Sequence, residues 1–201
     1  MSPLAVALEL PEAASGDLRE LDYQLARRCV AGDETAWREM VDRYGRLVYS
    51  VCLAAGLAPP EAEDVCQEVM LSALHGLRSY GGCRLSTWLY RITRRRIADF
   101  LRSSRRREGP AGLPGDPTFP AVRAEREARF KGWVEPTCEY ERVRQELARL
   151  EEPERSVMVA FHIAEVPVRE IASDIGLPEN TVKSHLRRAR LKLRRRLGGI
   201  E

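Results

Sequence analysis

Apolar side chains recur every three or four residues through most of the chain, which is the spacing of helices that bury one face. The first such pattern starts at Leu21 and is interrupted at Gly32-Asp33, so two helices that meet at a turn are predicted. Asp33 carries a side chain preferred at helix N-caps and is expected to begin the second helix. The apolar positions are Leu25, Cys29, Ala36, Trp37, Met40, Val41, Tyr44, Leu47, Val48, Val51 and Cys52.

A third helix is predicted over residues 61–77, and a fourth begins after the glycine-containing loop 79–84. Ser86 or Thr87 is the expected N-cap of the fourth helix. The apolar stripe of the third helix consists of Ala62, Val65, Cys66, Val69, Ala73, Leu74 and Leu77. The fourth has an apolar row of Trp88, Leu89, Ile92, Ile97, Phe100 and Leu101, surrounded by arginines.

Periodicity ends at residues 103–138, where proline and glycine are frequent among charged residues, as is typical of a linker. Residues 122–133 are compatible with a short helix, in which Phe130 and Trp133 could dock on a domain or a partner. Helical patterns resume at residue 139, with Pro153 at a favourable position to start a further helix. Their apolar positions are Tyr140, Val143, Leu147, Leu150, Val157, Met158, Phe161 and Ala164.

Residues 168–197 have the pattern of a helix-turn-helix. Ala172 allows two crossing helices to approach, Gly176 can adopt the positive φ that ends the first helix, and Pro178 opens the second. The apolar seam is formed by Ile171, Ile175, Val182 and Leu186. The outward face then contains Asn180, Thr181, Lys183, Ser184, Arg187 and Arg188.

Because alternating strand patterns are absent from the sequence, we predict an all-α protein of two helical domains joined by a flexible linker, with the helix-turn-helix in the C-terminal domain. The predicted division is an N-terminal extension at 1–20, a first domain at 21–102, the linker at 103–138 and a second domain at 139–198.

The net charge of +3 conceals two strongly basic segments. Residues 183–196 contain eight Lys or Arg and no acid, and residues 91–107 contain eight Arg against the single Asp99. A solvated helix face usually mixes charges of both signs, so this segregation favours binding to nucleic acid. In the first domain the arginines lie near Tyr80 and Tyr90, which could stack on unpaired bases, whereas Trp88 fits the core better.

The sequence offers little support for disulfide bonds, a metal site, catalysis or membrane insertion. The five cysteines include no C-x-x-C pair, which argues against a disulfide framework, and a zinc site with the three histidines is a minor alternative. Neither a nucleotide-binding loop nor a catalytic motif is present, so we expect no catalytic residues, no metal and no cofactor. Without a membrane-length apolar run or a signal-peptide pattern, a cytoplasmic protein without membrane insertion is expected.

Three ordered motifs carry a family resemblance: AEDVCQEVMLSAL, then RLSTWLYRITRRRIADFLR, then the segment from LARLEEPERSV to the helix-turn-helix. In this order they resemble sigma factors of bacterial RNA polymerase, of the extracytoplasmic-function (ECF) group. The resemblance covers about residues 22–102 and 139–198. It implies a factor that binds core RNA polymerase through its clamp helices and flap, selects promoter DNA and helps to open the duplex. The resemblance also implies an anti-sigma factor as a further partner.

The resemblance also implies roles for individual residues. It assigns clamp binding to a polar strip that residue chemistry alone would leave as an ordinary solvated face, made of Asp64, Gln67, Glu68 and Leu71. It assigns binding of the minus-ten DNA strand to Tyr80, Arg84, Tyr90, Arg91, Arg94, Arg95 and Arg102. The outward face of the second helix of the helix-turn-helix, from Asn180 to Arg188, is assigned to the minus-thirty-five duplex. Arg95 and Asn180 depart from the residues usual in the family, so its promoter preferences do not transfer.

Three rival functions can be distinguished. A helix-turn-helix regulator that is not a polymerase subunit would bind its promoter without core enzyme, but it leaves the basic segment at 91–107 unexplained. A nucleic-acid enzyme would need clustered acids or metal ligands, which are not apparent. An inactive sigma-like interaction protein would bind partners without supporting transcription.

Overall fold

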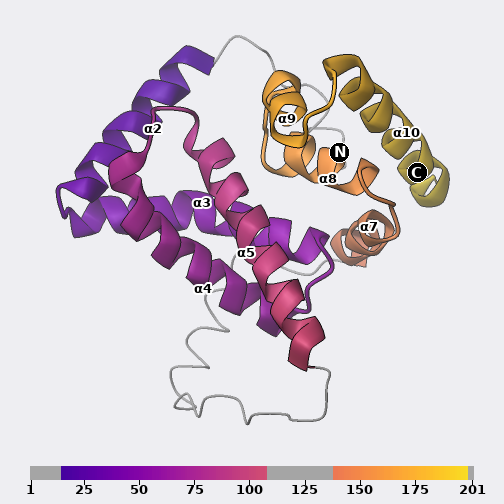
Figure 1. The fold of residues 1–201 in the computed structure, drawn as a ribbon, viewed down its shortest axis with the longest axis horizontal. Helices are drawn as coiled ribbons and strands as arrows, with labels where there is room; N and C mark the ends of the chain where they lie inside the picture. Colours follow the sequence, from indigo (N-terminus) through magenta and orange to yellow (C-terminus); the bar gives the residue numbers. More distant parts are fainter. Residues whose placement is uncertain (1–14, 108–137, 199–201) are drawn as a thin grey trace.

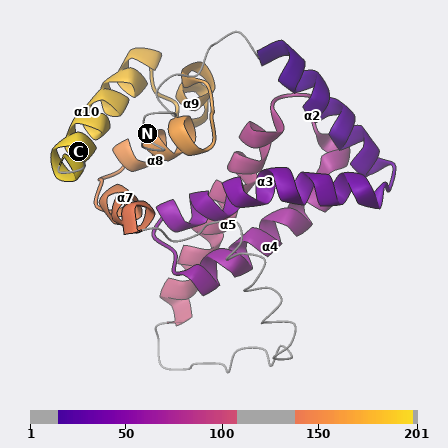
Figure 2. The ribbon, with the colours of Figure 1, turned by 180° about the vertical axis from the view of Figure 1, so that it is seen from behind.

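The computed structural model describes residues 15–107 and 138–198, which form two groups of helices (Figures 1 and 2). The first domain contains α2 (Ser15–Val30), α3 (Glu34–Ala54), α4 (Pro59–Gly76), a 3₁₀ turn (Leu77–Ser79) and α5 (Leu85–Arg107). The second contains α7 (Cys138–Ala148), α8 (Glu154–Met158), a π-helical turn (Val159–Ile163), α9 (Val168–Ile175) and α10 (Glu179–Leu197). Neither described range contains a strand, which confirms the prediction of an all-α fold with two helical domains.

The core of the first domain lies where α3, α4 and α5 pack against one another. Met40 and Val48 from α3, Val65 and Val69 from α4, and Leu89 from α5 are at most 1% exposed. These are positions of the predicted stripes, so the periodicity identified most of each buried face. Leu74 of α4 and Leu101 of α5, predicted in the same stripes, are 47% and 41% exposed. Each fully buried side chain stabilises the fold by about 1.5–3 kcal/mol through removal of its apolar surface from water.

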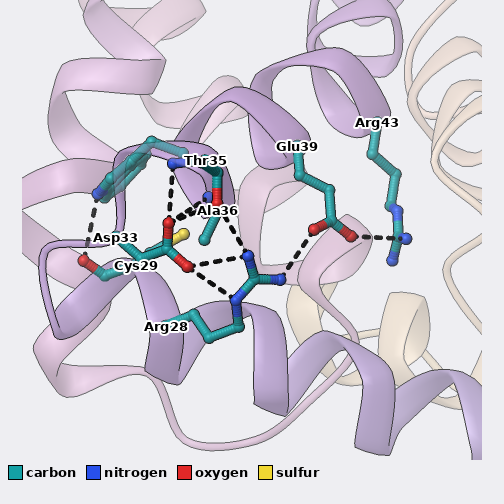
Figure 3. A network of polar contacts seen from close by, with 8 residues as sticks. Arg28, Cys29, Asp33, Thr35, Ala36, Glu39 and Arg43 are labelled. Carbon is teal, nitrogen blue, oxygen red and sulfur yellow. Dashed lines mark hydrogen bonds and ion pairs between the residues drawn. The ribbon is translucent and has the colours of Figure 1, made fainter.

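The corner between α2 and α3 is fixed by the Asp33 carboxylate (Figure 3). Its Oδ1 accepts hydrogen bonds from the backbone N–H groups of Thr35 at 2.8 Å and Ala36 at 3.2 Å, which confirms Asp33 as the N-cap. Arg28 donates to Asp33 Oδ2 at 2.9 Å and to Glu39 at 3.1 Å. Hydrogen bonds from the Thr35 hydroxyl, the Ala36 amide and Arg28 hold the pKa of Asp33 well below its usual range.

The start of α5 is capped by a residue from a different helix. The backbone N–H of Leu85 donates to Asp22 Oδ2 at 2.9 Å, and the Tyr44 hydroxyl donates to the other oxygen of the same buried carboxylate. The prediction that Ser86 or Thr87 caps this helix is therefore wrong. Both are buried inside its first turn, and neither hydroxyl has a hydrogen-bond partner among the described residues.

Two helix boundaries differ from the sequence prediction. The helix expected to start at Leu21 begins at Ser15, and α5 continues through Arg107 into the segment assigned to the linker. Helix-breaking Gly109-Pro110 lies just beyond that end, so the chain before it can continue its backbone hydrogen bonds. The predicted short helix at 122–133, with Phe130 and Trp133, lies outside the described residues.

The second domain contains the predicted helix-turn-helix. Gly176 ends α9 with a left-handed φ of 67°, and Pro178 directly precedes the first residue of α10. Ile171, Val182 and Leu186 are buried in the seam between the two helices. The α7 and α8 helices pack under α10, and the π-helical turn packs against α8 and α9.

Candidate nucleic-acid and polymerase interfaces

The polar strip on α4 lies on one face of that helix. Asp64, Glu68 and Leu71 are exposed and Gln67 is half-buried, while Val65 on the opposite side is buried. Spacings of three and four residues place these groups above one another on the helix surface. The strip therefore ends in Leu71, an apolar side chain that is 57% exposed.

An open apolar groove of about 460 Å³ adjoins this strip between the start of α3 and the end of α4. Its lining consists of the apolar Trp37, Met70, Leu71 and Leu74 together with the charged Glu34 and Arg38. Leu74, which the sequence pattern placed in the buried stripe, is 47% exposed because it lies at this edge. Sequence reasoning missed the groove, although Leu71 and Leu74 are an apolar pair at helical spacing beside a polar face.

Arg91 of α5 and Arg84 of the loop before it contact acids of the second domain. Arg91 donates to Asp174 at 2.9 Å and to Glu170 at 3.4 Å, both on α9. Arg84 donates to Glu165 at 3.3 Å. The hydrogen bond to Asp174 is the main cause that raises the pKa of Arg91.

The remaining residues assigned to the minus-ten strand fall into two groups. Tyr90 is only 3% exposed, donates from its hydroxyl to the Ser156 carbonyl at 3.3 Å, and has the Arg94 guanidinium 6.0 Å from its ring centroid. Arg95 and Arg102 are exposed, and Arg102 pairs with Asp99. Tyr90 therefore cannot stack on a base while the two domains are in contact.

Tyr80 and Trp88 form a pair at the loop before α5. Their ring centroids lie 5.6 Å apart in an edge-to-face arrangement, and both side chains are half-buried. The Tyr80 hydroxyl donates to the Cys83 carbonyl, which ties the loop to itself. Trp88 thus contacts the core, as its place in the apolar row predicted, and it also supports Tyr80.

On α10 the predicted outward side chains are displayed together. Asn180, Lys183, Ser184, Arg187 and Arg188 are exposed and Thr181 is half-buried. Because Val182 and Leu186 are buried on the opposite side, this face is available to a ligand. Its residues project from the first three turns of the helix.

Two buried acids lie beneath the same helix. Glu154 is 7% exposed and accepts a hydrogen bond from Lys192 at 2.7 Å, with Arg188 at 3.6 Å. Glu146 is 8% exposed and lies 3.6 Å from Arg196. These acids partly neutralise Arg188, Lys192 and Arg196 of α10. The pairing of Arg188 was not apparent from the sequence because Glu154 is distant along the chain.

The cysteines offer little reactivity. Cys29, Cys52 and Cys66 are free thiols buried in the first domain, as the sequence predicted, and Cys83 is half-buried. Burial raises the pKa of Cys29 to about 11 and that of Cys66 to about 12, so these thiols are protonated at neutral pH. Within 15–107 and 138–198 we find no cluster of His, Cys, Asp or Glu suited to a metal ion. Nor does this part of the chain contain a helix able to cross a membrane.

Comparison with known proteins decides the family. Residues 40–107 match the model of Sigma-70 region 2, and residues 140–193 match that of Sigma-70, region 4. The ECF RNA polymerase sigma factor SigM of Mycobacterium tuberculosis is 30% identical over 178 residues, which cover 88% of this chain and 85% of SigM. The chain belongs to the ECF RNA polymerase sigma factors.

Further relatives of this ECF sigma factor support the same family assignment. SigW of Bacillus subtilis is 28% identical over 83% of the chain and 91% of SigW. Two solved structures share the fold: CnrH in complex with the cytosolic domain of CnrY, with a TM-score of 0.59, and RpoE from Bartonella quintana in complex with the anti-sigma factor NepR, with a TM-score of 0.60. The first is 24% identical and covers 90% of this chain and 99% of its own; the second is 17% identical and covers 82% and 98%. The protein is thus a polymerase-associated sigma factor.

Proposed function

We propose that this ECF sigma factor binds core polymerase and promoter DNA through three surfaces, each on a different helix. The α4 strip binds core RNA polymerase, the arginine-rich surface of α5 and its preceding loop holds the unpaired minus-ten strand, and the outward face of α10 reads the minus-thirty-five duplex. The observation that supports this division best is that each helix buries its apolar stripe while it displays a distinct polar set.

The α4 strip fits a protein partner better than a nucleic acid because it is acidic at one end. Asp64 and Glu68 would repel phosphate but can pair with cations on the clamp helices of the polymerase, while Leu71 supplies apolar contact. The adjoining groove with Trp37 and Leu74 extends the apolar part of this surface. The second domain would contact the polymerase flap, as the family resemblance implies.

The α5 surface fits unpaired DNA. Exposed Arg95 and Arg102, with Arg84, Arg91 and Arg94, can track a phosphate backbone, and Tyr80 and Tyr90 can stack on bases once the surface is accessible. Opening a base pair costs a few kcal/mol, and capture of the released bases can offset that cost without any hydrolysis. No catalytic residue is needed for this role, so we propose that the protein is not an enzyme.

The α10 surface fits duplex DNA. Lys183 and Arg187 lie one turn apart on the exposed face, so they can enter a major groove together and contact base edges. Arg194 and Arg195 lie about two turns further on and would meet mainly phosphate. We assign residues 138–198 to this domain and residues 15–107 to the polymerase and minus-ten domain, because the described helices of each domain begin and end within these bounds.

We further propose a regulatory partner and a cellular location for this protein. The solved structures of similar fold are complexes, one of them with an anti-sigma factor, so we propose that an anti-sigma factor also regulates this protein. Because core polymerase and promoter DNA are its partners, we place it in the cytoplasm.

A binding experiment tests the polymerase surface. Asp64→Arg combined with Gln67→Ala should abolish or strongly weaken capture of purified core polymerase and leave the helical fold intact, because surface substitutions change stability little. The matched control is Asp42→Arg with Gln24→Ala, which alters exposed residues of the same two types on α3 and α2. Capture of core enzyme by the strip variant at the level of the control would overturn this assignment.

The alternative of a helix-turn-helix regulator is tested by whether promoter binding requires core polymerase. A regulator of that kind would select its promoter fragment as free protein, whereas the proposed function requires core enzyme for promoter-specific binding by the full chain. Footprints on the same DNA with and without core polymerase separate the two.

A further inference from the structure

Two side chains of the π-helical turn hold an arginine of α10. The Nε–H of Arg190 donates to His162 Nε2 at 3.2 Å, and its guanidinium carbon lies 5.5 Å from the centroid of the Phe161 ring. The rings of Phe161 and His162 are edge to face, with centroids 5.0 Å apart. Arg190 is exposed, whereas the two rings are half-buried. An exposed guanidinium of α10 is therefore held by side chains from outside the helix-turn-helix.

The backbone of the π-helical turn brings these two neighbours together. The N–H of Ala164 donates to the carbonyl of Val159, five residues earlier, at 3.0 Å. Consecutive side chains of an α-helix diverge by about 100°, and a turn closed over five residues contains more residues, so its side chains diverge less. Phe161 and His162 can therefore approach the same group. Single π-helical turns are frequent at functional sites, which directs attention to the group they hold.

The groups that hold Arg190 leave its charge in place. Burial and Arg190 itself lower the pKa of His162 to about 4, so the ring is neutral at neutral pH and accepts through a lone pair. Within the described ranges, the ion pairs of α10 are formed by Arg188, Lys192 and Arg196 with buried acids. Arg190 is not among them. A neutral ring nitrogen and an aromatic face fix this guanidinium without the neutralisation that a carboxylate would cause.

Arg190 continues the proposed duplex-binding face. Lys183, Arg187 and Arg190 stand at i, i+4 and i+7, so they share one flank of α10 over about 10 Å at ~1.5 Å per residue, and all three are exposed. Because His162 takes the Nε–H, the two terminal nitrogens of Arg190 keep their N–H donors for an anion. A place beyond the first turns of the helix suits the phosphate backbone better than base edges.

We propose that Phe161 and His162 are positioning residues, which hold Arg190 at the edge of the α10 surface so that it binds a backbone phosphate of duplex DNA. The proposal rests on the assignment of α10 to duplex DNA. An exposed arginine usually adds little to an ionic contact, because its long side chain must be ordered when the contact forms. Here the side chain is ordered before DNA arrives, so less of the interaction is lost to that ordering.

Removal of the arginine should weaken duplex binding more than removal of its support. Arg190→Ala deletes one phosphate contact, so affinity should fall about fivefold and the slope of log affinity against log salt should decrease by about one. His162→Leu keeps the arginine but releases it, and affinity should fall about threefold. His162→Gln retains a hydrogen-bond acceptor and should keep most of the wild-type affinity.

The test uses the full chain and a fluorescent duplex of about 25 base pairs of random sequence, because a phosphate contact does not depend on the base sequence. Anisotropy titrations over a salt series give affinity and slope, and circular dichroism confirms that each variant is folded. The charge-matched control is Arg142→Ala, which removes an exposed cation from α7. Arg187→Ala reports the α10 face independently of Arg190. His162→Leu is also combined with Arg190→Ala, so that a double-mutant cycle measures their coupling.

We expect His162→Leu to weaken binding when Arg190 is present and to change nothing when Arg190 is already alanine. If His162→Leu costs the same in both backgrounds, the histidine acts through the fold and the positioning role is refuted. If Arg190→Ala binds like the Arg142→Ala control while Arg187→Ala binds more weakly, Arg190 contacts no phosphate and the proposal fails alone. If Arg187→Ala also matches the control, the assignment of α10 to duplex DNA fails, and the proposal fails with it.

Discussion

The buried Asp22 side chain joins three helices of the first domain. Its carboxylate, 3% exposed, accepts the backbone N–H of Leu85 at the start of α5 and the hydroxyl of Tyr44 from α3, while Asp22 itself belongs to α2. Asp22→Ala removes both hydrogen bonds and leaves two buried donors without a partner. Each bond to a charged group contributes about 1.5–3 kcal/mol, and release of the buried carboxylate offsets part of the loss, so we expect a net destabilisation of about 3 kcal/mol.

Tyr44→Phe is the matched comparison because it removes one of the two bonds and keeps the cap on α5. Its cost should be about 1.5 kcal/mol. Urea unfolding followed by tryptophan fluorescence gives both values if all variants carry Trp133→Phe, so that the signal comes from Trp37 and Trp88 of the first domain. If Asp22→Ala is no more destabilising than Tyr44→Phe, the carboxylate does not support α5 in the way described.

Three further outcomes are expected. Burial and the nearby Arg190 lower the pKa of His162 to about 4, compared with ~6.5 in the unfolded chain. The neutral ring is therefore favoured in the folded state. This contribution to stability is complete above pH ~6.5 and is lost as the pH falls from ~6.5 towards 4. Urea titrations at a series of pH values should show a loss of roughly 1 kcal/mol that His162→Gln removes, after allowance for partial exposure. Lys183→Ala or Arg187→Ala should reduce the preference for the correct upstream element by roughly 1–3 kcal/mol per lost base contact, while Arg194→Ala should weaken matched and scrambled duplexes alike. Titrations with both duplexes over a salt series measure the difference. Arg95→Ala should impair duplex opening more than initial promoter binding, and permanganate reactivity of melted thymines measures the difference.

Features with a local cause were predictable from the sequence. Asp33 caps α3 through backbone groups two and three residues away, and Gly176 ends α9 through its own conformation, so both signals are complete within a short window. The buried faces of α3 and α4 followed from periodicity for the same reason. The display of Lys183 and Arg187 opposite Val182 is a consequence of helix geometry alone.

Features that depend on long-range contact were not predictable. Ser86 and Thr87 looked like caps because nothing in their neighbourhood reveals that Asp22, distant in sequence, occupies that position. A retrospective signal exists, since an acid in the apolar stripe of a helix must find a buried partner. The pairing of Arg91 with Asp174 has no comparable signal in the sequence. Both are charged residues of a type common on solvated helix surfaces, and their contact depends on how the two domains meet.

Transcription by purified core polymerase on fragmented genomic DNA of the source cell tests the central claim most directly. RNA 5′ ends are sequenced with and without the protein. We predict new start sites that appear only in its presence and share two sequence elements upstream, one near minus ten and one near minus thirty-five. If the added protein creates no start sites beyond those of core enzyme alone, the chain does not act as a sigma factor.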